Sequence, residues 1–213
     1  MFHIILKKCW SLKRNIGLFM ITTKEELNYY ILQDAISSKR SGKYFIKPRL
    51  FGDEIWKFQL ILRKTEYYFN LYNSSKKHLF IPYIWYRYLF HKTSVKLGFS
   101  IPLNVFGPGL AIPHYGTITV NSMAKVGKNC RLHEGVNIGA TNGSKKAPCI
   151  GDNVFIGTGA KIIGDIVIAD NVVIGANAVV VKSITESGGT YGGVPAKKIS
   201  SNDSHMHLPS ELF

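Results

Sequence analysis

Several features that define large protein classes are missing from this sequence. Its cysteines form no Cys-x-x-Cys pair and no even-numbered set, which argues against a disulfide framework and against a zinc site; they are Cys9, Cys130 and Cys149. No uninterrupted apolar run approaches the ~20 residues of a transmembrane helix, and no small-residue cleavage site follows the apolar patches of residues 1–20. We therefore expect a protein of the reducing cytoplasm, without a membrane span or a signal peptide.

Acidic residues are scarce in the first part of the chain. Residues 1–98 contain 18 Lys or Arg and only 6 Asp or Glu, whereas residues 99–213 contain 9 and 7. The aromatic residues divide in the same way, since 20 of the 26 lie before Phe99. The basic excess indicates an anionic partner, such as an acidic glycan or the inner face of a membrane, and fits a solvated helical surface equally well. The usual nucleic-acid-binding modules are absent, so we expect no nucleic acid partner.

The first part reads as helical. We expect helices at residues 23–37, 54–73 and 81–98. Thr23 followed by Glu26 is typical of a capping box that opens the first helix. Pro82 lies in the first turn of the third helix and Gly98 at its end, both favoured positions. The sequence thus predicts an α-helical N-terminal domain of residues 1–98.

A six-residue period runs through the second part. From His114 to Thr185 the sequence divides without a gap into twelve hexads, and the first place is Ile, Val or Leu in ten of them. The fifth place is small or apolar in nearly all. This repeat predicts a mainly β fold, a parallel β-helix in which each hexad forms one side of a triangular prism. Three hexads make a coil, so we expect four coils above an irregular first turn at residues 99–113.

Two places break this period. His114 stands where a branched aliphatic residue is otherwise found, at a cost in packing. Residues 141–149, TNGSKKAPC, are too polar for a side of the prism, so we expect a loop, after which Ile150 resumes the repeat. A loop thrown over a flat face forms the wall of a cleft. The two exceptions are therefore the candidate functional positions.

Three stretches of the second part match one known family. They are HYGTITVNSMAKVGKNCRLHEGVNIGATNG, APCIGDNVFIGTGAKIIGDIVIADNVVIGANAVV and GGVPAKKI. The segment from His114 to Lys197 resembles the serine acetyltransferase branch of the hexapeptide-repeat acyltransferases, and the helical part resembles that family's N-terminal domain more loosely. The resemblance implies a left-handed β-helix at residues 99–200, homotrimers with active sites between neighbouring prisms, and acetyl-CoA as the acyl donor. Residues 201–213 are expected to form a loose tail.

The resemblance also assigns site residues. His114 falls on the family's catalytic histidine, whose neutral imidazole takes a proton from the acceptor hydroxyl as that oxygen attacks the thioester, without a metal or a covalent enzyme intermediate. The backbone of four residues matches positions against the pantetheine arm: Gly139, Ala140, Thr158 and Gly159. Lys197 and Lys198 fall near the nucleotide phosphates. Ordinary structural roles fit these six residues about as well.

Two departures from the family pattern concern the acceptor. Pro102 stands where the family has an aspartate that orients the histidine, and we hypothesise that Glu134, about one coil above His114, replaces it. Lys146-Ala147-Pro148 stands where the family has Arg-His-Pro, which removes the fork of arginine. We expect the acceptor to contact His133, Lys145 and Lys146. The altered loop favours a sugar hydroxyl of a surface polysaccharide, or of its precursor, as the acceptor.

Three other functions remain open on the sequence alone. A serine O-acetyltransferase of cysteine biosynthesis shares the mechanism and differs in the acceptor. A non-catalytic β-helix that serves as a scaffold needs no role for His114. A zinc-dependent carbonic anhydrase on such a prism needs three well-placed histidines, and the hexads supply only His114 and His133.

Overall fold

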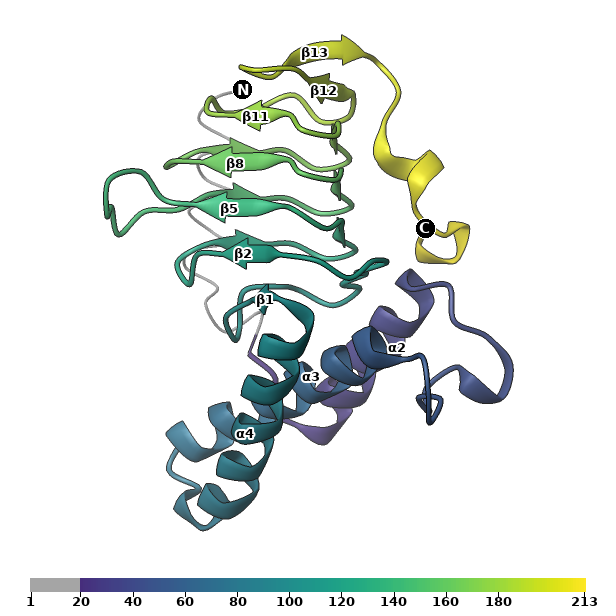
Figure 1. Cartoon of the computed structure of the whole chain (residues 1–213), viewed down its shortest axis with the longest axis vertical. Helices are drawn as coiled ribbons and strands as arrows, with labels where there is room; N and C mark the ends of the chain where they lie inside the picture. Colours follow the sequence, from purple (N-terminus) through teal and green to yellow (C-terminus); the bar gives the residue numbers. More distant parts are fainter. Residues whose placement is uncertain (1–19) are drawn as a thin grey trace.

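The computed structural model describes residues 20–213, so Cys9 and the expectations for the N-terminal segment lie outside the described residues. Three helices pack under one end of a tall stack of short strands, and the C-terminal residues run back from the far end toward the helices (Figure 1). The helices are α2 (Lys24–Ser37), α3 (Glu54–Asn73) and α4 (Phe80–Leu97), with short 3-10 turns at Gly42–Tyr44 and Lys77–Leu79. Among residues 20–213, no helix is both long and apolar enough to cross a membrane.

The predicted helices are confirmed, and local sequence explains their ends. Thr23 accepts a hydrogen bond from the backbone of Glu26, whose side chain bonds back to Thr23, so the expected capping box opens α2. Gly98 ends α4 in the left-handed conformation with a φ of 74°. That conformation costs a residue with a Cβ free energy and costs glycine almost none.

The strands form three sheets, which are the three sides of a prism. The first sheet contains β1 (Phe99–Ser100), β2 (Ile118–Val120), β5 (Asn137–Gly139), β8 (Lys161–Ile163) and β11 (Val179–Val180). The second contains β3 (Lys125–Val126), β6 (Cys149–Ile150) and β9 (Val167–Ile168). The third contains β4 (Arg131–Leu132), β7 (Phe155–Ile156), β10 (Val173–Ile174), β12 (Thr190–Gly192) and β13 (Lys197–Ser200).

The pairing register confirms the parallel β-helix. All the pairings among the strands within these sheets are parallel except the one between β12 and β13. Lys161 pairs with Val179, three hexads further on. Lys125 pairs with Cys149, which is four hexads on. The extra hexad forms the loop predicted after β5 and no side of the prism. The twelve hexads therefore build eleven sides, one fewer than the twelve sides of the four coils expected.

The prism interior and the helices share one core. The aliphatic residues at the first place of the hexads are buried, as are the small residues at the fifth place, such as Ala124 and Ala160. Each buried aliphatic side chain contributes ~1.5–3 kcal/mol. The same apolar cluster includes Phe58 and Leu62 of α3 and Phe90 of α4. Residue 98 therefore marks a change in the sequence pattern, whereas the hydrophobic core is continuous across it. The domain boundaries remain a prediction.

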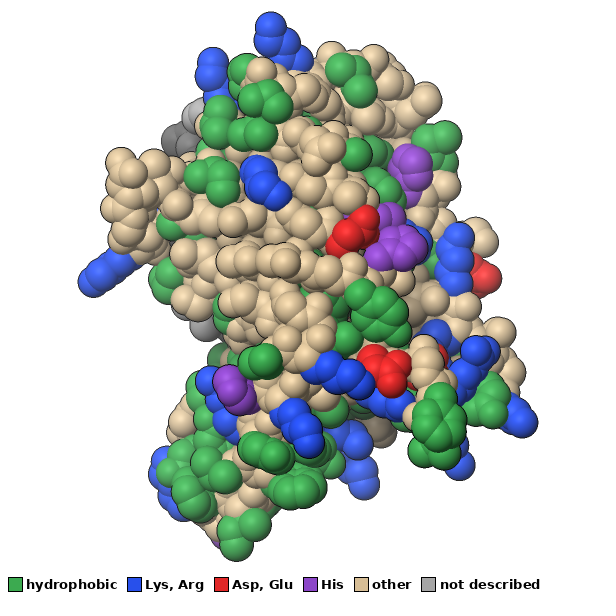
Figure 2. All heavy atoms as spheres, viewed as in Figure 1, with side chains coloured by type: hydrophobic (Ala, Val, Ile, Leu, Met, Phe, Trp, Pro, Cys, Tyr) green, Lys and Arg blue, Asp and Glu red, His purple; other side chains and the backbone are tan. Residues whose placement is uncertain are grey.

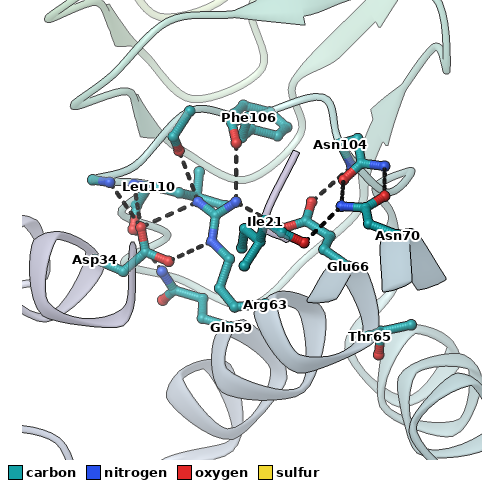
Figure 3. Close-up of polar contacts among 12 residues, drawn as sticks. Ile21, Asp34, Gln59, Arg63, Thr65, Glu66, Asn70, Asn104, Phe106 and Leu110 are labelled. Atoms are coloured by element: carbon teal, nitrogen blue, oxygen red, sulfur yellow. Dashed lines mark hydrogen bonds and ion pairs between the residues drawn. The ribbon is translucent and has the colours of Figure 1, made fainter. Parts of the chain in front are cut away.

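A buried ion cluster fastens the helices to the first coil (Figure 3). The Arg63 guanidinium donates to Asp34 of α2 at 2.8 and 3.1 Å and to Glu66 of its own helix at 3.0 Å. It also donates to the carbonyl oxygens of Phe106 and Gly107, at 2.9 and 2.8 Å. All three charged side chains are buried. Burial raises the pKa of both carboxyl groups, and the charge of Arg63 opposes this shift.

An asparagine ladder lines the corner between the second and third sheets. Asn129 donates to Asn153 at 2.8 Å, and Asn153 donates to Asn171 at 2.9 Å. The three residues have φ values of 57°, 56° and 62°. Asparagine tolerates this left-handed conformation better than other residues with a Cβ, and its side chain bonds to the next coil. The ladder therefore fixes the turn in three successive coils.

The C-terminal residues pack on this ladder, so the prediction of a loose tail is wrong. The Ser204 hydroxyl donates to the Asn153 carbonyl oxygen, and its backbone N–H donates to Asn171. Leu208 is buried, and the 3-10 turn Ser210–Leu212 contacts α2. The segment is polar along its sequence, and its partners lie more than thirty residues away. Composition alone could not predict those contacts.

Candidate active site

Chemically active side chains gather at the corner between the third and first sheets, here called the histidine corner. His114 precedes β2, His133 and Glu134 join β4 to β5, and Thr158 joins β7 to β8. Because β2, β5 and β8 are paired in register, the corners that lead into them are stacked. The stacking brings together residues that lie up to 44 positions apart in the sequence.

The candidate base lies beside a carboxylate. The rings of His114 and His133 have centroids 5.6 Å apart. Nitrogen atoms of both rings and an oxygen of Glu134 all lie within 4.8 Å of one another. Thr158 Oγ1 donates to Glu134 Oε1 at 2.9 Å, which fixes the carboxylate. The second oxygen, Oε2, is buried without a hydrogen-bond partner among residues 20–213 and lies 3.9 Å from His133 Nδ1.

The surroundings of the histidine corner lower the pKa of both Glu134 and His133, with opposite effects on their charge at neutral pH. Hydrogen bonds from its own backbone N–H and from Thr158, with the nearby histidines, lower the pKa of Glu134 below the usual carboxyl value. Burial and the positive charge of Arg131 lower the pKa of His133. Arg131 Nε donates to His133 Nε2 at 3.4 Å, so the proton of the neutral ring is assigned to Nδ1, which faces Glu134. At neutral pH the corner therefore holds an anionic Glu134 and a neutral His133.

Gly116 is a site residue that the sequence analysis missed. A Cβ on Gly116 would lie 3.0 Å from the Cβ of Glu134, and the φ of 134° is one that glycine adopts readily. The missing side chain therefore allows Glu134 to pack against the backbone two residues beyond His114. The only signal in the sequence was the glycine itself in HYG.

The predicted loop is present, and it follows β5, whereas the histidine corner precedes this strand. Residues 141–146 are exposed and protrude beyond β5 (Figure 1), whereas Ala147 is buried where the chain returns to the wall. Lys145 is exposed, and Lys146 pairs with Asp165 at 2.9 Å. Glu134 precedes β5 and the loop follows it. A single chain therefore does not bring Lys145 and Lys146 to the histidine corner.

The six residues predicted to bind acetyl-CoA are divided in the same way. Thr158 and Gly159 lie at the histidine corner, and Gly139 and Ala140 lie at the loop end of β5. Lys197 and Lys198 lie on β13, the antiparallel strand at the far end of the prism. Lys198 pairs with Glu186 at 2.6 Å, which raises its pKa and partly neutralises its charge. Both lysines are exposed, and among residues 20–213 Lys197 has no ion pair, so it is the better placed of the two to meet a phosphate.

The histidine corner also offers ligands that a metal ion accepts. His114, His133 and Glu134 supply two imidazoles and one carboxylate, a donor set suited to several divalent transition metals. Their spacing of up to 4.8 Å is wider than the ~3.3 Å between ligands of a tetrahedral zinc ion with 2.0–2.1 Å bonds. The expectation of a metal-free site remains a prediction.

Comparisons with known proteins agree with the fold and with the resemblance. Residues 150–182 match the family model described as bacterial transferase hexapeptide (six repeats). A serine acetyltransferase of Staphylococcus aureus strain Mu50 is 33% identical over 116 residues, which are 50% of this chain and 54% of the relative. This chain thus matches about half the length of that curated relative.

Two solved structures extend the likeness beyond the repeats. The serine acetyltransferase of Brucella abortus strain S19 has a TM-score of 0.65 at 26% identity and covers 85% of this chain and 72% of its own. The same enzyme in complex with coenzyme A has a TM-score of 0.59 at 26% identity, with 84% and 68% covered. These likenesses confirm the left-handed form of the β-helix and the similarity to serine acetyltransferases.

Proposed function

We propose that this hexapeptide-repeat protein is an acetyl-CoA-dependent O-acetyltransferase in which His114 is the general base. The observation that carries the proposal is the exposed His114 imidazole beside the Glu134 carboxylate, on a prism similar to those of serine acetyltransferases. A histidine at this place of the repeat loses apolar packing. A catalytic role explains why the position is not aliphatic.

The reaction follows from the chemistry of a neutral imidazole. The His114 ring takes the proton of the acceptor hydroxyl as the oxygen attacks the thioester carbonyl carbon of acetyl-CoA. The tetrahedral intermediate collapses with cleavage of the carbon–sulfur bond, and the imidazolium returns the proton to the departing thiolate. The products are an O-acetyl ester and free coenzyme A. Holding both substrates together supplies much of the acceleration.

Glu134 orients the base and stabilises its charged form. One carboxylate oxygen is held by Thr158, and the other is directed among the histidines without a hydrogen bond of its own. An anion within 4.8 Å favours the imidazolium that forms during transfer. Glu134 thereby takes over the orienting role of the family's aspartate, whose position is occupied by Pro102 in this sequence. The lowered pKa of His133 keeps its ring neutral beside Glu134, and we assign this ring to contact with the acceptor.

The complete site is assigned to two neighbouring chains of a homotrimer. The histidine corner and the protruding loop lie at opposite ends of β5, so a neighbouring prism must supply the second wall. The predicted pantetheine contacts are divided between the same two edges. Packing of prisms side by side brings one chain's Thr158 and Gly159 toward another chain's Gly139 and Ala140. A cytoplasmic location fits the acetyl-CoA donor.

L-Serine is the acceptor that the comparisons favour. Each relative named above is a serine acetyltransferase. A sugar hydroxyl, the acceptor expected from the sequence, is the second candidate. One observation favours it: Lys146, which replaces the family's arginine, is paired with Asp165 and so is less available to an amino acid carboxylate.

Release of free thiol from acetyl-CoA tests both the activity and the acceptor. We expect thiol release with L-serine or with an acceptor sugar, and a loss of about 10²–10⁴-fold in kcat for His114→Ala. His78→Ala is the matched control, because His78 is an exposed histidine of the 3-10 turn between α3 and α4 and is not part of the prism. No thiol release by the parent protein with any acceptor would favour the scaffold, and an unchanged kcat in His114→Ala would exclude His114 as the base. Turnover with sugars alone would exclude serine.

A further inference from the structure

Helix α4 lies within a long stretch of sequence that contains no negative charge. Residues 67–133 include eight Lys or Arg and no Asp or Glu. The buried ion cluster does not account for this uneven distribution, because its three charged side chains, Asp34, Arg63 and Glu66, lie outside this stretch. The surface built from it is therefore suited to an anionic partner.

The helix is apolar on two opposite sides. On one side Phe90 and Leu97 are buried in the shared core. On the other side Ile81, Trp85 and Tyr88 are 78%, 58% and 55% exposed. The exposed set also includes Phe80, Ile84 and Val95. At 100° per residue, these six positions fall on one continuous face of the helix.

Positive charges surround this apolar face. Arg87, Lys92 and Lys96 are exposed on α4, and among residues 20–213 only Lys96 lies near a carboxylate, at 3.9 Å from Glu54. Figure 2 shows the hydrophobic side chains gathered over α4, with Lys and Arg among and around them. A large apolar patch with a polar rim marks an interaction site in a soluble domain.

A groove continues the apolar face onto the prism. It has a volume of about 800 Å³ and lies between α4 and the start of the first sheet. Tyr88 and Val95 form one wall, and Phe99, Ile101 and Thr117 form the other. The apolar surface thus extends from the helix to the first two strands.

We propose that the exposed face of α4 docks on the surface of an anionic phospholipid bilayer. Trp, Tyr and Ile would enter the boundary between headgroups and acyl chains, and Arg87 and Lys92 would meet lipid phosphates. Tryptophan and tyrosine favour that boundary. A second copy of the chain is a poorer occupant, because a two-fold contact of this face would set its unpaired cations against each other. The inference goes beyond the proposed acetyl transfer and does not depend on it.

Sedimentation with vesicles tests the proposal on the full chain. We expect binding to vesicles of phosphatidylcholine with roughly a third phosphatidylglycerol, weaker binding as salt is added, and little binding to phosphatidylcholine alone. The double variant Ile81→Ser, Trp85→Ser should reduce the partition coefficient by about tenfold or more. Arg87→Gln and Lys92→Gln should each reduce it about fivefold.

The controls separate docking from folding and from self-association. Leu50→Ser, Phe51→Ser removes two side chains that are 80% and 83% exposed outside α4, and it should bind vesicles like the parent. Circular dichroism and the thermal midpoint should be unchanged in the α4 variants, because the substituted side chains are exposed. The proposal would be overturned if the control variant lost as much vesicle binding as the α4 variants, or if the parent protein bound neutral and anionic vesicles equally. It would also be overturned if the α4 variants abolished self-association of the chain and left vesicle binding unchanged.

Discussion

The two oxygens of Glu134 have different surroundings, and this difference defines the role proposed for the residue. Oε1 accepts from Thr158, whereas Oε2 is buried and has no donor of its own among the described residues. A buried carboxylate oxygen without a donor is costly unless a positive charge arises nearby. The imidazolium formed during proton transfer is such a charge. We therefore interpret Glu134 as a positioning residue that stabilises the imidazolium formed during proton transfer.

Replacement of Glu134 by Gln should lower kcat by about 10–100-fold, with a smaller effect on KM for acetyl-CoA. The pKa of Glu134 is lowered, so its carboxylate stays charged above that pKa and its support is lost only as the pH falls through it. Without the charge, the acidic limb of the pH profile should move to lower pH, because the imidazolium loses its counter-ion.

Glu134→Asp and Thr158→Val provide the controls for this prediction. The aspartate keeps the charge and should leave the acidic limb in place, even if the shorter side chain lowers kcat. Thr158→Val removes only the hydrogen bond to Oε1, so its loss should be smaller than that of Glu134→Gln. An unchanged pH profile in Glu134→Gln would show that the carboxylate does not act on the base.

Helices and coils were predictable from the sequence because their causes are local. The capping box of α2 and the Gly98 cap each occupy a few consecutive residues, and the six-residue period repeats one short pattern; the structure confirms all three. The contacts between elements were not predictable in this way. Nothing in the sequence around Arg63 indicates burial, because arginine is usually exposed, yet the side chain is fully buried since its partners come from α2 and from the first coil.

Arg63 should dominate the attachment of the helices to the prism. Arg63→Met should lower the free energy of unfolding by about 3–5 kcal/mol, because Asp34 and Glu66 would be left as buried charges without their cation. Chemical denaturation followed by circular dichroism measures this loss. Lys57→Met, which removes a partly exposed cation of the same helix, should cost less than about 1 kcal/mol. Equal losses in the two variants would show that the cluster does not anchor the helices.

Across the whole molecule, the candidate site could be predicted only in part. Sequence resemblance identifies His114, and the 18-residue coil places Glu134 one level above it, as the structure shows. The contacts of Glu134 with Gly116 and Thr158 could be recognised only in the structure, because they depend on how successive corners stack. The same stacking separates the loop from the histidine corner. One chain thus contains both halves of the proposed site without joining them.

This separation predicts that two inactive variants can complement each other. His114→Ala removes the base, and Lys145→Glu with Lys146→Glu reverses the charge of the loop, so each should be inactive in the thiol-release assay. If every site combines the histidine of one chain with the loop of its neighbour, random trimers refolded from a 1:1 mixture should recover about a quarter of the parental activity. Separately refolded variants mixed afterwards are the control and should stay inactive. No recovery in the co-refolded sample, with trimers verified by light scattering, would place both halves of the site on one chain. Full activity of the loop variant alone would remove the two lysines from the site.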